Sequence, residues 1–201
     1  MLDMTKDFAR YDPVWRTAEP YMRARKNDIH IPLSFKWAAR LLEEYSDADR
    51  DVCLLAILLH DIGWYTIDMK DIIEKGFSGP NMLQSDVRYL HEAESVRLGT
   101  EVLKQTGWDD ATIAQVCEII DGHDTRAEPR HLNDRIVRDA DKLWRFDVTG
   151  IAVACDWFKL TPHAYADRLE DQKDKLETDA GRAYATQTLA ASRNTLMLHV
   201  I

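Results

Sequence analysis

The 201-residue sequence has few of the features that mark secreted or membrane proteins. Its three cysteines, Cys53, Cys117 and Cys155, lie far apart inside apolar segments and form no Cys-x-x-Cys pair, so we expect reduced thiols rather than disulfides. No apolar run reaches the ~18 residues that a membrane helix needs. Residues 1–15 contain no apolar region of signal-peptide length. We therefore expect a cytoplasmic protein that is neither exported nor inserted in a membrane.

Positive charge is also scarce. The formal net charge is −9, and nonspecific binding to duplex nucleic acid depends on Lys and Arg side chains that neutralise phosphates. We therefore expect no duplex nucleic acid partner. A small anionic substrate remains compatible with this charge, because a bound divalent metal can reverse the sign of the local field.

The motifs of several common enzyme classes are absent. The chain has no Walker A phosphate loop, no Gly-x-Gly-x-x-Gly dinucleotide loop and no Gly-x-Ser-x-Gly nucleophile elbow. Strand signals are almost absent as well, because no Asn-Gly or Asp-Gly turn lies between two alternating runs. Nothing in the sequence therefore indicates covalent catalysis or a β-rich fold.

The most apolar stretch of the chain covers residues 52–59. It is apolar on every side, so periodicity cannot separate a buried helix from a buried strand. Its Ala and Leu content, a cap at Asp49 or Asp51 and a stop at Gly63 favour a central buried helix.

Elsewhere the apolar residues recur at helical spacing. With 201 residues, 45% of them hydrophobic, the chain can bury one good core. We predict an all-α, single-domain protein over 1–201, with a motif-bearing core at about 30–145 and helices over 147–201 packed on it. The other predicted helices cover 33–45 with Pro32 in the first turn, 87–105, 110–120, a segment starting at 133 or 134, 148–158, and two helices in 162–201 broken near 179–181.

A His60-Asp61 doublet ends the buried stretch and is the most informative feature of the sequence. A histidine next to an aspartate, delivered by a buried segment, is one way to place nitrogen and oxygen ligands on a divalent metal. Further members of the same residue types lie on or at the edge of helical patterns: His30, His91, His123 and Asp141.

This order resembles that of the HD-domain superfamily of metal-dependent phosphohydrolases. Ile62-Gly63 follows the doublet, and residues 139–143 read Asp-Ala-Asp-Lys-Leu, close to the superfamily's Asp-Ala-Asp-(Arg/Lys)-Leu stretch. The resemblance covers roughly residues 30–145 and implies a helical fold with a metal site in its core. The implied metal ligands are His30, His60, Asp61 and Asp141.

The resemblance also implies a chemistry. One or two divalent ions (Mn, Mg, Co, Ni or Fe) would acidify water and stabilise charge on a phosphate. We thus expect hydrolysis of a phosphoester or phosphoanhydride bond in a small phosphorylated metabolite, with a nucleotide as the first candidate. Asp61 is expected to be both a ligand and a catalytic acceptor of the water proton. His91 and His123 could bind a second ion, or act catalytically by contacting phosphate and moving protons, or be core or capping histidines.

Four charged residues near these positions are candidates for substrate binding: Asp124, Arg126, Lys142 and Arg145. Arg126 could grip a phosphate through two hydrogen bonds, or could pair with Asp124 or a surface carboxylate. Lys142 and Arg145 flank Asp141 and could neutralise substrate charge or point away from it.

Other residues carry weaker predictions. A long loop over 65–85 is a candidate lid, with Lys70 and Lys75 as anion contacts. Trp64 is expected to pack in the core or lid, or to wall the pocket or stack on a base. Asp139 is expected to support the ligands or to be structural. The histidines outside the pattern are expected to be exposed or capping: His131, His163 and His199.

Two other functions would use the same ligands. A two-iron oxygenase would hold its second iron through His91 and His123 and activate dioxygen. A noncatalytic metal-binding regulatory module would keep the ligands without chemistry. The sequence leaves the substrate, the native metal, the number of ions and the oligomeric state open, a homodimer included.

Overall fold

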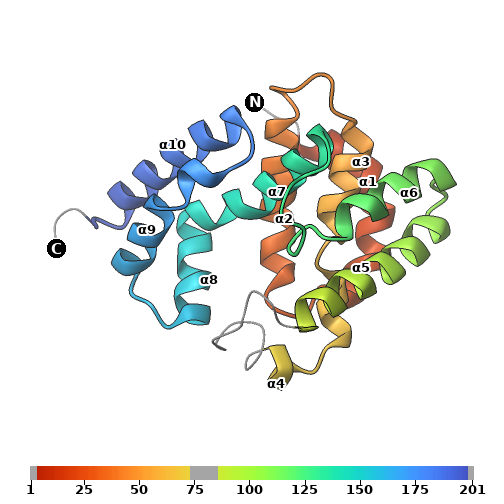
Figure 1. Cartoon of the computed structure of the whole chain (residues 1–201), viewed down its shortest axis with the longest axis horizontal. Coiled ribbons are helices and arrows are strands. Elements are labelled where there is room, and N and C mark those ends of the chain that lie inside the picture. The colour runs from red at the N-terminus through yellow and green to blue at the C-terminus, as the bar shows by residue number, and fades with distance from the viewer. Residues whose placement is uncertain (1–3, 73–85, 199–201) are drawn as a thin grey trace.

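The computed structural model describes residues 4–72 and 86–198, which form helices joined by short connections (Figure 1). No strand occurs within these two ranges, so the predicted all-α class is confirmed. The longer helices are α1 (Met4–Ala18), α2 (Asn27–Leu41), α3 (Arg50–Leu59), α5 (Asp86–Gln105), α6 (Asp110–Ile120), α7 (Leu132–Leu143), α8 (Val148–Phe158), α9 (Pro162–Glu170) and α10 (Asp179–Thr195). The short elements are η1 (Glu19–Tyr21), η2 (Ile62–Thr66), α4 (Met69–Asp71), η5 (Trp144–Phe146) and η6 (Lys173–Lys175). None of the helices in the described ranges is both long and apolar enough to cross a membrane.

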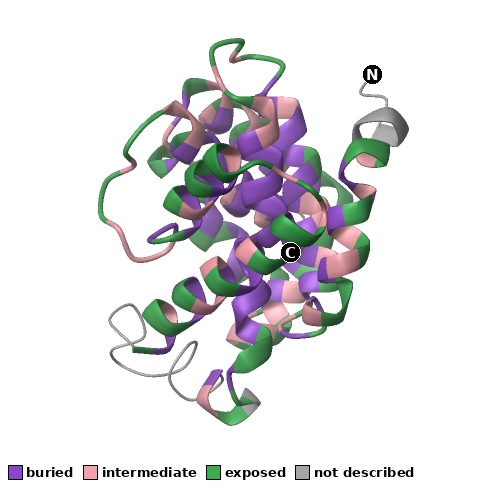
Figure 2. Cartoon of the chain, turned by 90° about the vertical axis from the view of Figure 1, so that its right-hand side faces the viewer, coloured by how far each residue is buried: buried purple, intermediate pink, exposed green. Residues whose placement is uncertain are grey.

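Helix α3 is the centre of the fold. Asp49 caps it by accepting a hydrogen bond from the backbone N–H of Val52 at 3.0 Å. Every residue from 52 to 59 is buried, and α1, α2, α6 and α7 pack around the helix. Figure 2 shows the buried residues gathered where the helices meet. Because α3 is covered on all sides, the residues that follow it are delivered to the interior.

Helices α8, α9 and α10 lie on one side of α7, and α5 and α6 lie on the other (Figure 1). Asp139 of α7 joins α7 to the start of α10. Its buried carboxylate accepts hydrogen bonds from the N–H groups of Glu177 and Thr178 and from the Thr178 hydroxyl, at 2.7, 2.8 and 2.6 Å. Asp139 was expected either to support the ligands or to be structural, and these contacts show the structural role. One cluster of buried hydrophobic residues has members from Tyr11 to Leu198. The single domain over 1–201 stays a prediction.

Several helix boundaries differ from the prediction, among them the end of α2, which lies at Leu41 instead of 45. Helix α2 begins at Asn27, ahead of Pro32, because Lys26 adopts a left-handed φ of 58° and turns the chain into the helix earlier. The two helices predicted within 162–201 are present as α9 and α10, but the predicted position of the break near 179–181 is wrong, because Thr178 caps α10 and places those residues in its first turn. His131 caps α7, which is one of the two roles expected for that residue. The helix was predicted to start at 133 or 134 and instead begins at Leu132.

Helix α1, for which no boundaries were predicted, is tied to α3. The carboxylate of Asp51 accepts hydrogen bonds from Arg10 at 3.0 and 2.5 Å and from the Tyr11 hydroxyl at 2.6 Å. Burial opposes the ionisation of Asp51, but the hydrogen bonds from Arg10 and Tyr11 outweigh it and lower the pKa of this carboxyl below its ordinary value.

Candidate metal centre

The His60-Asp61 doublet leaves α3 at its buried end. His60 still has helical backbone angles, whereas Asp61 departs from the helix with φ −112° and ψ 4°. His60 Nδ1 lies 2.9 Å from the carbonyl oxygen of Ile57 and donates to it, so Nε2 keeps its lone pair. Both residues are buried. The doublet thus presents a nitrogen lone pair and a carboxylate to the interior.

His30 from α2 and Asp141 from α7 face the doublet, because these two helices pack directly on each other. His30 Nε2 lies 2.8 Å from Asp141 Oδ1, and His30 Nδ1 lies 3.4 Å from Asp61 Oδ2. His60 Nε2 is 3.3 Å from the same Asp141 oxygen. One ligand atom each from His30, His60 and Asp61 lies within 4.8 Å of the others. The four residues predicted as metal ligands therefore converge.

His91 of α5 and His123, which follows α6, form a second group. Their Nε2 atoms lie 3.4 and 3.5 Å from Asp61 Oδ1, whereas the first group approaches Oδ2. His123 Nδ1 is 2.9 Å from the carbonyl oxygen of Ile120, which repeats the arrangement at His60. The ligand atoms of this group also lie within 4.8 Å of one another. Asp61 thus places one oxygen on each group, as a carboxylate shared by two ions would.

Several ring nitrogens in this centre have no hydrogen-bond partner within the described part of the chain. They are His30 Nδ1, His60 Nε2 and both nitrogens of His91, all buried. A buried polar atom without a partner costs about 1–3 kcal/mol, and a cation that accepts the lone pair removes this cost. Mixed imidazole and carboxylate donors suit Mn, Fe, Co and Ni, while Mg prefers oxygen donors. The residues present therefore fit one or two divalent ions.

The two predicted acidic ligands, Asp61 and Asp141, are ionised. Burial opposes the charge of Asp61, but the imidazole of His60 and the three other imidazoles close to the carboxylate outweigh it and hold the pKa of Asp61 well below its usual range. Burial also opposes the charge of Asp141, and there Arg145 and the neighbouring imidazoles keep the pKa well below its usual range. Two carboxylates are thus available in their anionic form at neutral pH.

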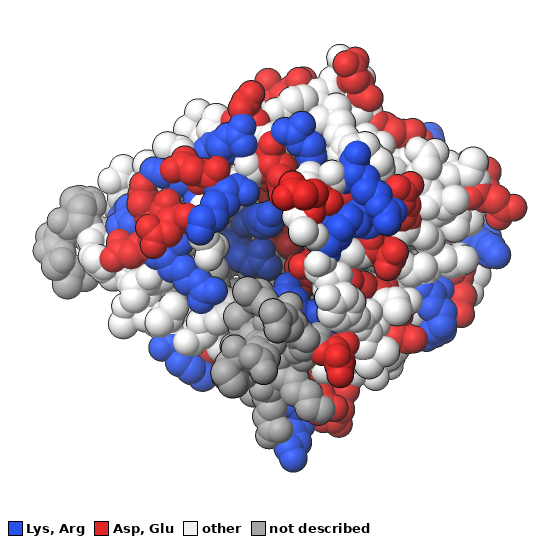
Figure 3. Space-filling model, viewed as in Figure 1, with Lys and Arg blue, Asp and Glu red and all other residues white. Residues whose placement is uncertain are grey.

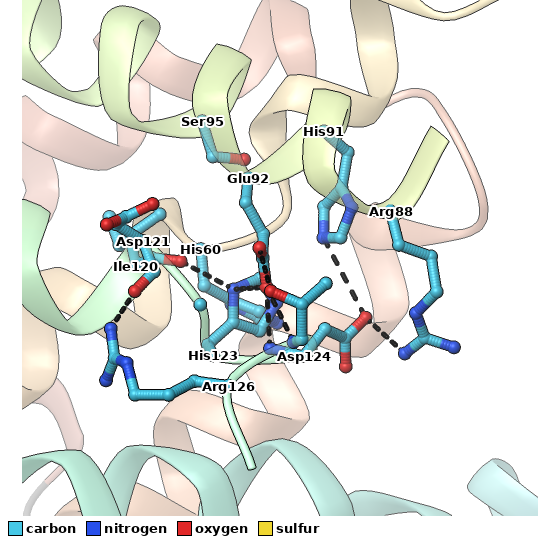
Figure 4. Close-up of polar contacts among 12 residues, drawn as sticks. His60, Arg88, His91, Glu92, Ser95, Ile120, Asp121, His123, Asp124 and Arg126 are labelled. Carbon is cyan, nitrogen blue, oxygen red and sulfur yellow. Dashed lines mark hydrogen bonds and ion pairs between the residues drawn. The ribbon is translucent and has the colours of Figure 1, made fainter. Parts of the chain in front are cut away.

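The residues after α6 point in two directions (Figure 4). Asp124 faces the centre, with Oδ2 at 3.8 Å from His91 Nε2 and 2.7 Å from Arg88 NH2. Arg126 extends away from Asp124, donates to buried Asp134 at 2.6 Å and donates to two backbone carbonyls near the end of α6. Arg126 thus pairs with a carboxylate, although with a buried one that was not predicted. This arrangement does not support the predicted phosphate grip.

Arg145 lies beside the predicted ligand Asp141, whereas Lys142 lies at the surface. Arg145 NH1 donates to the carbonyl oxygen of Asp141 at 3.0 Å and is 3.6 Å from its carboxylate. Lys142 is 41% exposed and lies 3.7 Å from Glu177 Oε1. Both line a cavity of ≈ 250 Å³ together with Lys175. Arg145 is therefore the better placed of the two to act near the centre.

The weaker predictions fall mostly outside the centre. Lys70 is exposed, and Lys75, residues 73–85 of the predicted lid and His199 lie outside the described residues. His163 is exposed, as expected, and lies 3.2 Å from Asp167.

Sequence reasoning missed two arginines beside the predicted ligands, and it named Trp64 without the contacts that this residue makes. Trp64 Nε1 donates to Asp61 Oδ1 at 2.9 Å, and its ring stacks on His91 with centroids 4.1 Å apart. Arg25 NH1 lies 3.6 Å from Asp61 Oδ2, and its guanidinium carbon is 4.3 Å from the Trp64 ring centroid. Nothing local in the sequence indicates Arg25. Arg88 had a usable signal, because it precedes His91 by about one turn of the same helix.

Buried Glu92 anchors the segment that follows α6. Its carboxylate accepts hydrogen bonds from the N–H groups of Asp124 and Thr125 and from the Thr125 hydroxyl, at 2.8, 2.9 and 2.6 Å (Figure 4). From the other side, Arg138 of α7 donates to the carbonyl oxygen of Gly122 at 3.0 Å. The segment is therefore held by both α5 and α7.

Comparison with known proteins adds one finding. The family model described as the HD domain matches residues 28–145, more than half of the 201-residue chain. The matched range contains all six histidine and aspartate residues of the two groups. No curated protein and no solved structure matches the chain.

Proposed function

Since the chain belongs to the HD domain family of metal-dependent phosphohydrolase-like proteins, we propose that it hydrolyses a phosphoester or phosphoanhydride bond. The proposed substrate is a small phosphorylated metabolite, with a nucleotide as the first candidate. The observation that carries the proposal is the arrangement of two histidine groups on the two oxygens of Asp61, with buried ring nitrogens that lack a partner in the described chain. The proposed ligands are His30, His60, Asp61 and Asp141 for one divalent ion, with His91 and His123 for a second.

The chain's own residues supply orientation and proton transfer. A divalent ion here would acidify a bound water molecule and neutralise charge on a phosphate oxygen. Asp61 is ionised and lies between the two groups, so it can accept the proton that the attacking water loses. Burial lowers the pKa of His91 below its ordinary value, so this ring is neutral near pH 7 and available as a ligand or proton acceptor. Burial of the whole group excludes bulk water and strengthens these electrostatic interactions.

Metal analysis combined with a substrate screen tests the proposal. Ions per chain are measured in protein purified without added metal, and phosphate release is followed with Mn, Mg, Co, Ni or Fe. We expect Asp61→Asn to lower kcat/KM by at least about 100-fold. Asp156→Asn, on the exposed side of α8, is the matched control and should leave kcat/KM unchanged. No phosphate release from nucleotides or other phosphorylated compounds with any of these metals would refute the proposal.

The sharing of Asp61 between two groups also favours a second candidate, a two-iron oxygenase. His91 and His123 would then hold the second iron. Two irons per chain and activity that requires dioxygen would assign this function, whereas a single ion other than iron would exclude it. Retention of the protein's biological role in Asp61→Asn would instead assign a noncatalytic metal-binding module.

A further inference from the structure

A cavity of ≈ 250 Å³ lies where the end of α7 and η5 meet the segment around η6. The residues that line it are Lys142, Arg145, Phe146, Gln172, Lys175 and Leu176. None of them belongs to the two groups of predicted metal ligands. The cavity would hold about eight water molecules at roughly 30 Å³ each, and it is a little smaller than the pockets of ~300–1,000 Å³ that take drug-sized ligands. It therefore suits a small molecule or one part of a larger molecule.

The lining of this cavity is positively charged, although the chain as a whole carries −9. Lys142, Arg145 and Lys175 line it, and no Asp or Glu among the described residues does. Glu177 Oε1 lies 3.7 Å from Lys142 Nζ, but these side chains are 24% and 41% exposed, so water screens the pair. Figure 3 shows a hollow in the middle of one face with Lys and Arg side chains at its base, in the region where Figure 1 places α7. The cavity therefore favours an anion.

Phe146 and Leu176 give the cavity an apolar part, and hydrogen bonds fix both of them. Their side chains are buried. The carbonyl oxygen of Phe146 accepts a hydrogen bond from the Ser192 hydroxyl at 2.8 Å, and that of Leu176 accepts one from Arg182 NH1 at 2.5 Å. Asp139 of α7 holds the residues that follow Leu176 through their backbone N–H groups. Walls that are already in place lower the entropy cost of binding a ligand.

Arg145 connects the cavity to the metal centre. It lines the cavity, and its NH1 donates to the carbonyl oxygen of Asp141 at 3.0 Å and lies 3.6 Å from the Asp141 carboxylate. A guanidinium has five N–H donors, so Arg145 can contact Asp141 and an anion in the cavity at the same time. A molecule in the cavity would therefore lie one side chain away from a predicted metal ligand.

We propose that this cavity is a second anion-binding site, which takes the carboxylate or phosphate group of a small organic anion and packs its apolar part on Phe146 and Leu176. Lys142 and Lys175 supply positive charge, and Arg145 supplies directed hydrogen bonds. The anion has two possible sources: the non-reacting end of a substrate whose phosphate lies at the metal centre, or a separate small molecule. Only the first source involves the proposed hydrolysis, and the site itself does not depend on it.

Calorimetric titration of the Mn²⁺-loaded protein with benzoate tests the site. Benzoate joins a carboxylate to an apolar ring, and we expect a Kd of about 1 mM. Benzylamine, the same ring with a positive charge, should not bind measurably. Lys175→Gln should weaken benzoate binding by about 3-fold or more, because it removes one charge at an exposed position. Lys173→Gln is the matched control, because Lys173 lies in the same short helix, pairs with Glu170 and does not line the cavity.

Lys142→Gln is a second variant, and Tm and ions per chain are measured for every variant because Lys142 is next to Asp141. Weaker benzoate binding in Lys175→Gln and Lys142→Gln, with the wild-type affinity in Lys173→Gln, would support the site. No binding of benzoate at about ten times the expected Kd would overturn it. Equal binding of benzylamine, an unchanged affinity in both Lys142→Gln and Lys175→Gln, or an equal loss in Lys173→Gln would also overturn it.

A second titration separates the two sources of the anion. Phosphonoacetate, 3-phosphonopropionate and 4-phosphonobutyrate carry an unreactive phosphonate for the metal centre and a carboxylate at increasing distance from it. Their partners without the carboxylate are methylphosphonate, ethylphosphonate and propylphosphonate. If one acid binds at least about 10-fold more tightly than its partner, and Lys175→Gln removes part of this gain, the site takes the end of the substrate. If none does while benzoate binds as expected, the site takes a separate anion.

The anion site and the proposed hydrolase can fail separately. Phosphate release by a protein that does not bind benzoate would overturn the anion site and leave the hydrolase intact. Benzoate binding that depends on Lys175, in a protein that releases phosphate from no compound, would refute the hydrolase and support the anion site.

Discussion

Replacing Gly63 by alanine would press apart the two elements that hold His91 against Asp61. Gly63 lies in η2 and crosses α5 so closely that its N–H donates to Ser95 Oγ at 2.8 Å. A Cβ at this position would lie 2.1 Å from the carbonyl oxygen of His91 and 2.4 Å from the backbone nitrogen of Ser95. These are backbone atoms that cannot rotate away, so η2 and α5 would have to separate by about 1 Å to restore normal contact distances.

The cost of this separation can be worked out from the same contacts. Overpacking costs about 1–3 kcal/mol, and a clash with backbone atoms places Gly63→Ala at about 3 kcal/mol. In a chain of this length, 1 kcal/mol corresponds to a Tm shift of about 2–4 °C, so we expect Tm to fall by about 6–12 °C. Because His91 would move with α5, the variant should also retain fewer ions per chain than the wild type.

Gly99→Ala, on the same helix, is the matched control. A Cβ at Gly99 would meet Leu59 Cβ at 3.6 Å, an ordinary van der Waals contact. Alanine is favoured over glycine inside a helix by about 0.5–1 kcal/mol, which corresponds to a rise in Tm of about 1–4 °C. The assays are thermal unfolding followed by circular dichroism and elemental analysis of bound metal. If Gly63→Ala kept the wild-type Tm and metal content, or if the two alanines acted alike, the reasoning would be refuted.

Three further predictions follow from contacts already described. Trp64→Phe keeps the ring on His91 but removes the hydrogen bond to Asp61, so Mn²⁺ affinity measured by titration should fall about 10-fold or more, and unchanged affinity would contradict this. Asp139→Ala leaves buried donors at the start of α10 unpaired, so urea unfolding should show a loss of about 2–4 kcal/mol, and a loss below about 1 kcal/mol would argue against the role. Asp51 has a folded pKa below its ordinary 3.8, so its stabilising effect is present above that pH and is lost as the pH falls through the folded pKa. The Tm difference between the wild type and Asp51→Asn should therefore stay constant above about pH 5 and shrink as the pH falls below about 4, whereas a difference that stays constant over the whole range would contradict the assignment.

The parts of the fold that could be predicted are those with local causes. Helix α6 illustrates this, since Asp109 precedes it and accepts hydrogen bonds from the N–H groups of Ala111 and Thr112 at its start. The convergence of the candidate ligands could be anticipated for a similar reason, because the side chains of His60 and Asp61 carry metal-binding atoms that few other residue types offer. Chemical identity and caps can be read from the sequence without knowing the tertiary contacts.

Residues whose role depends on distant packing could not be predicted. Arg25 stands next to other cations in the sequence and resembles a surface residue, yet it is buried by Trp64 and Trp157, which come from remote segments. Asp134 and Arg138 have the spacing of an exposed helical ion pair, yet both are buried. In both cases the residues are buried by helices whose position in the fold cannot be read from the sequence.

The doublet itself shows how closely local and tertiary causes are joined. Side chains of adjacent residues in a helix diverge by about 100°, so His60 and Asp61 could not both face one ion if α3 continued. The structure avoids this because α3 ends at Leu59 and Asp61 adopts φ −112° and ψ 4°. Gly63 was predicted to stop the helix, but it has no left-handed φ, and its lack of a side chain instead admits the backbone of α5. The glycine after the doublet is therefore required because it lets α5 bring His91 to the carboxylate that His60 already faces.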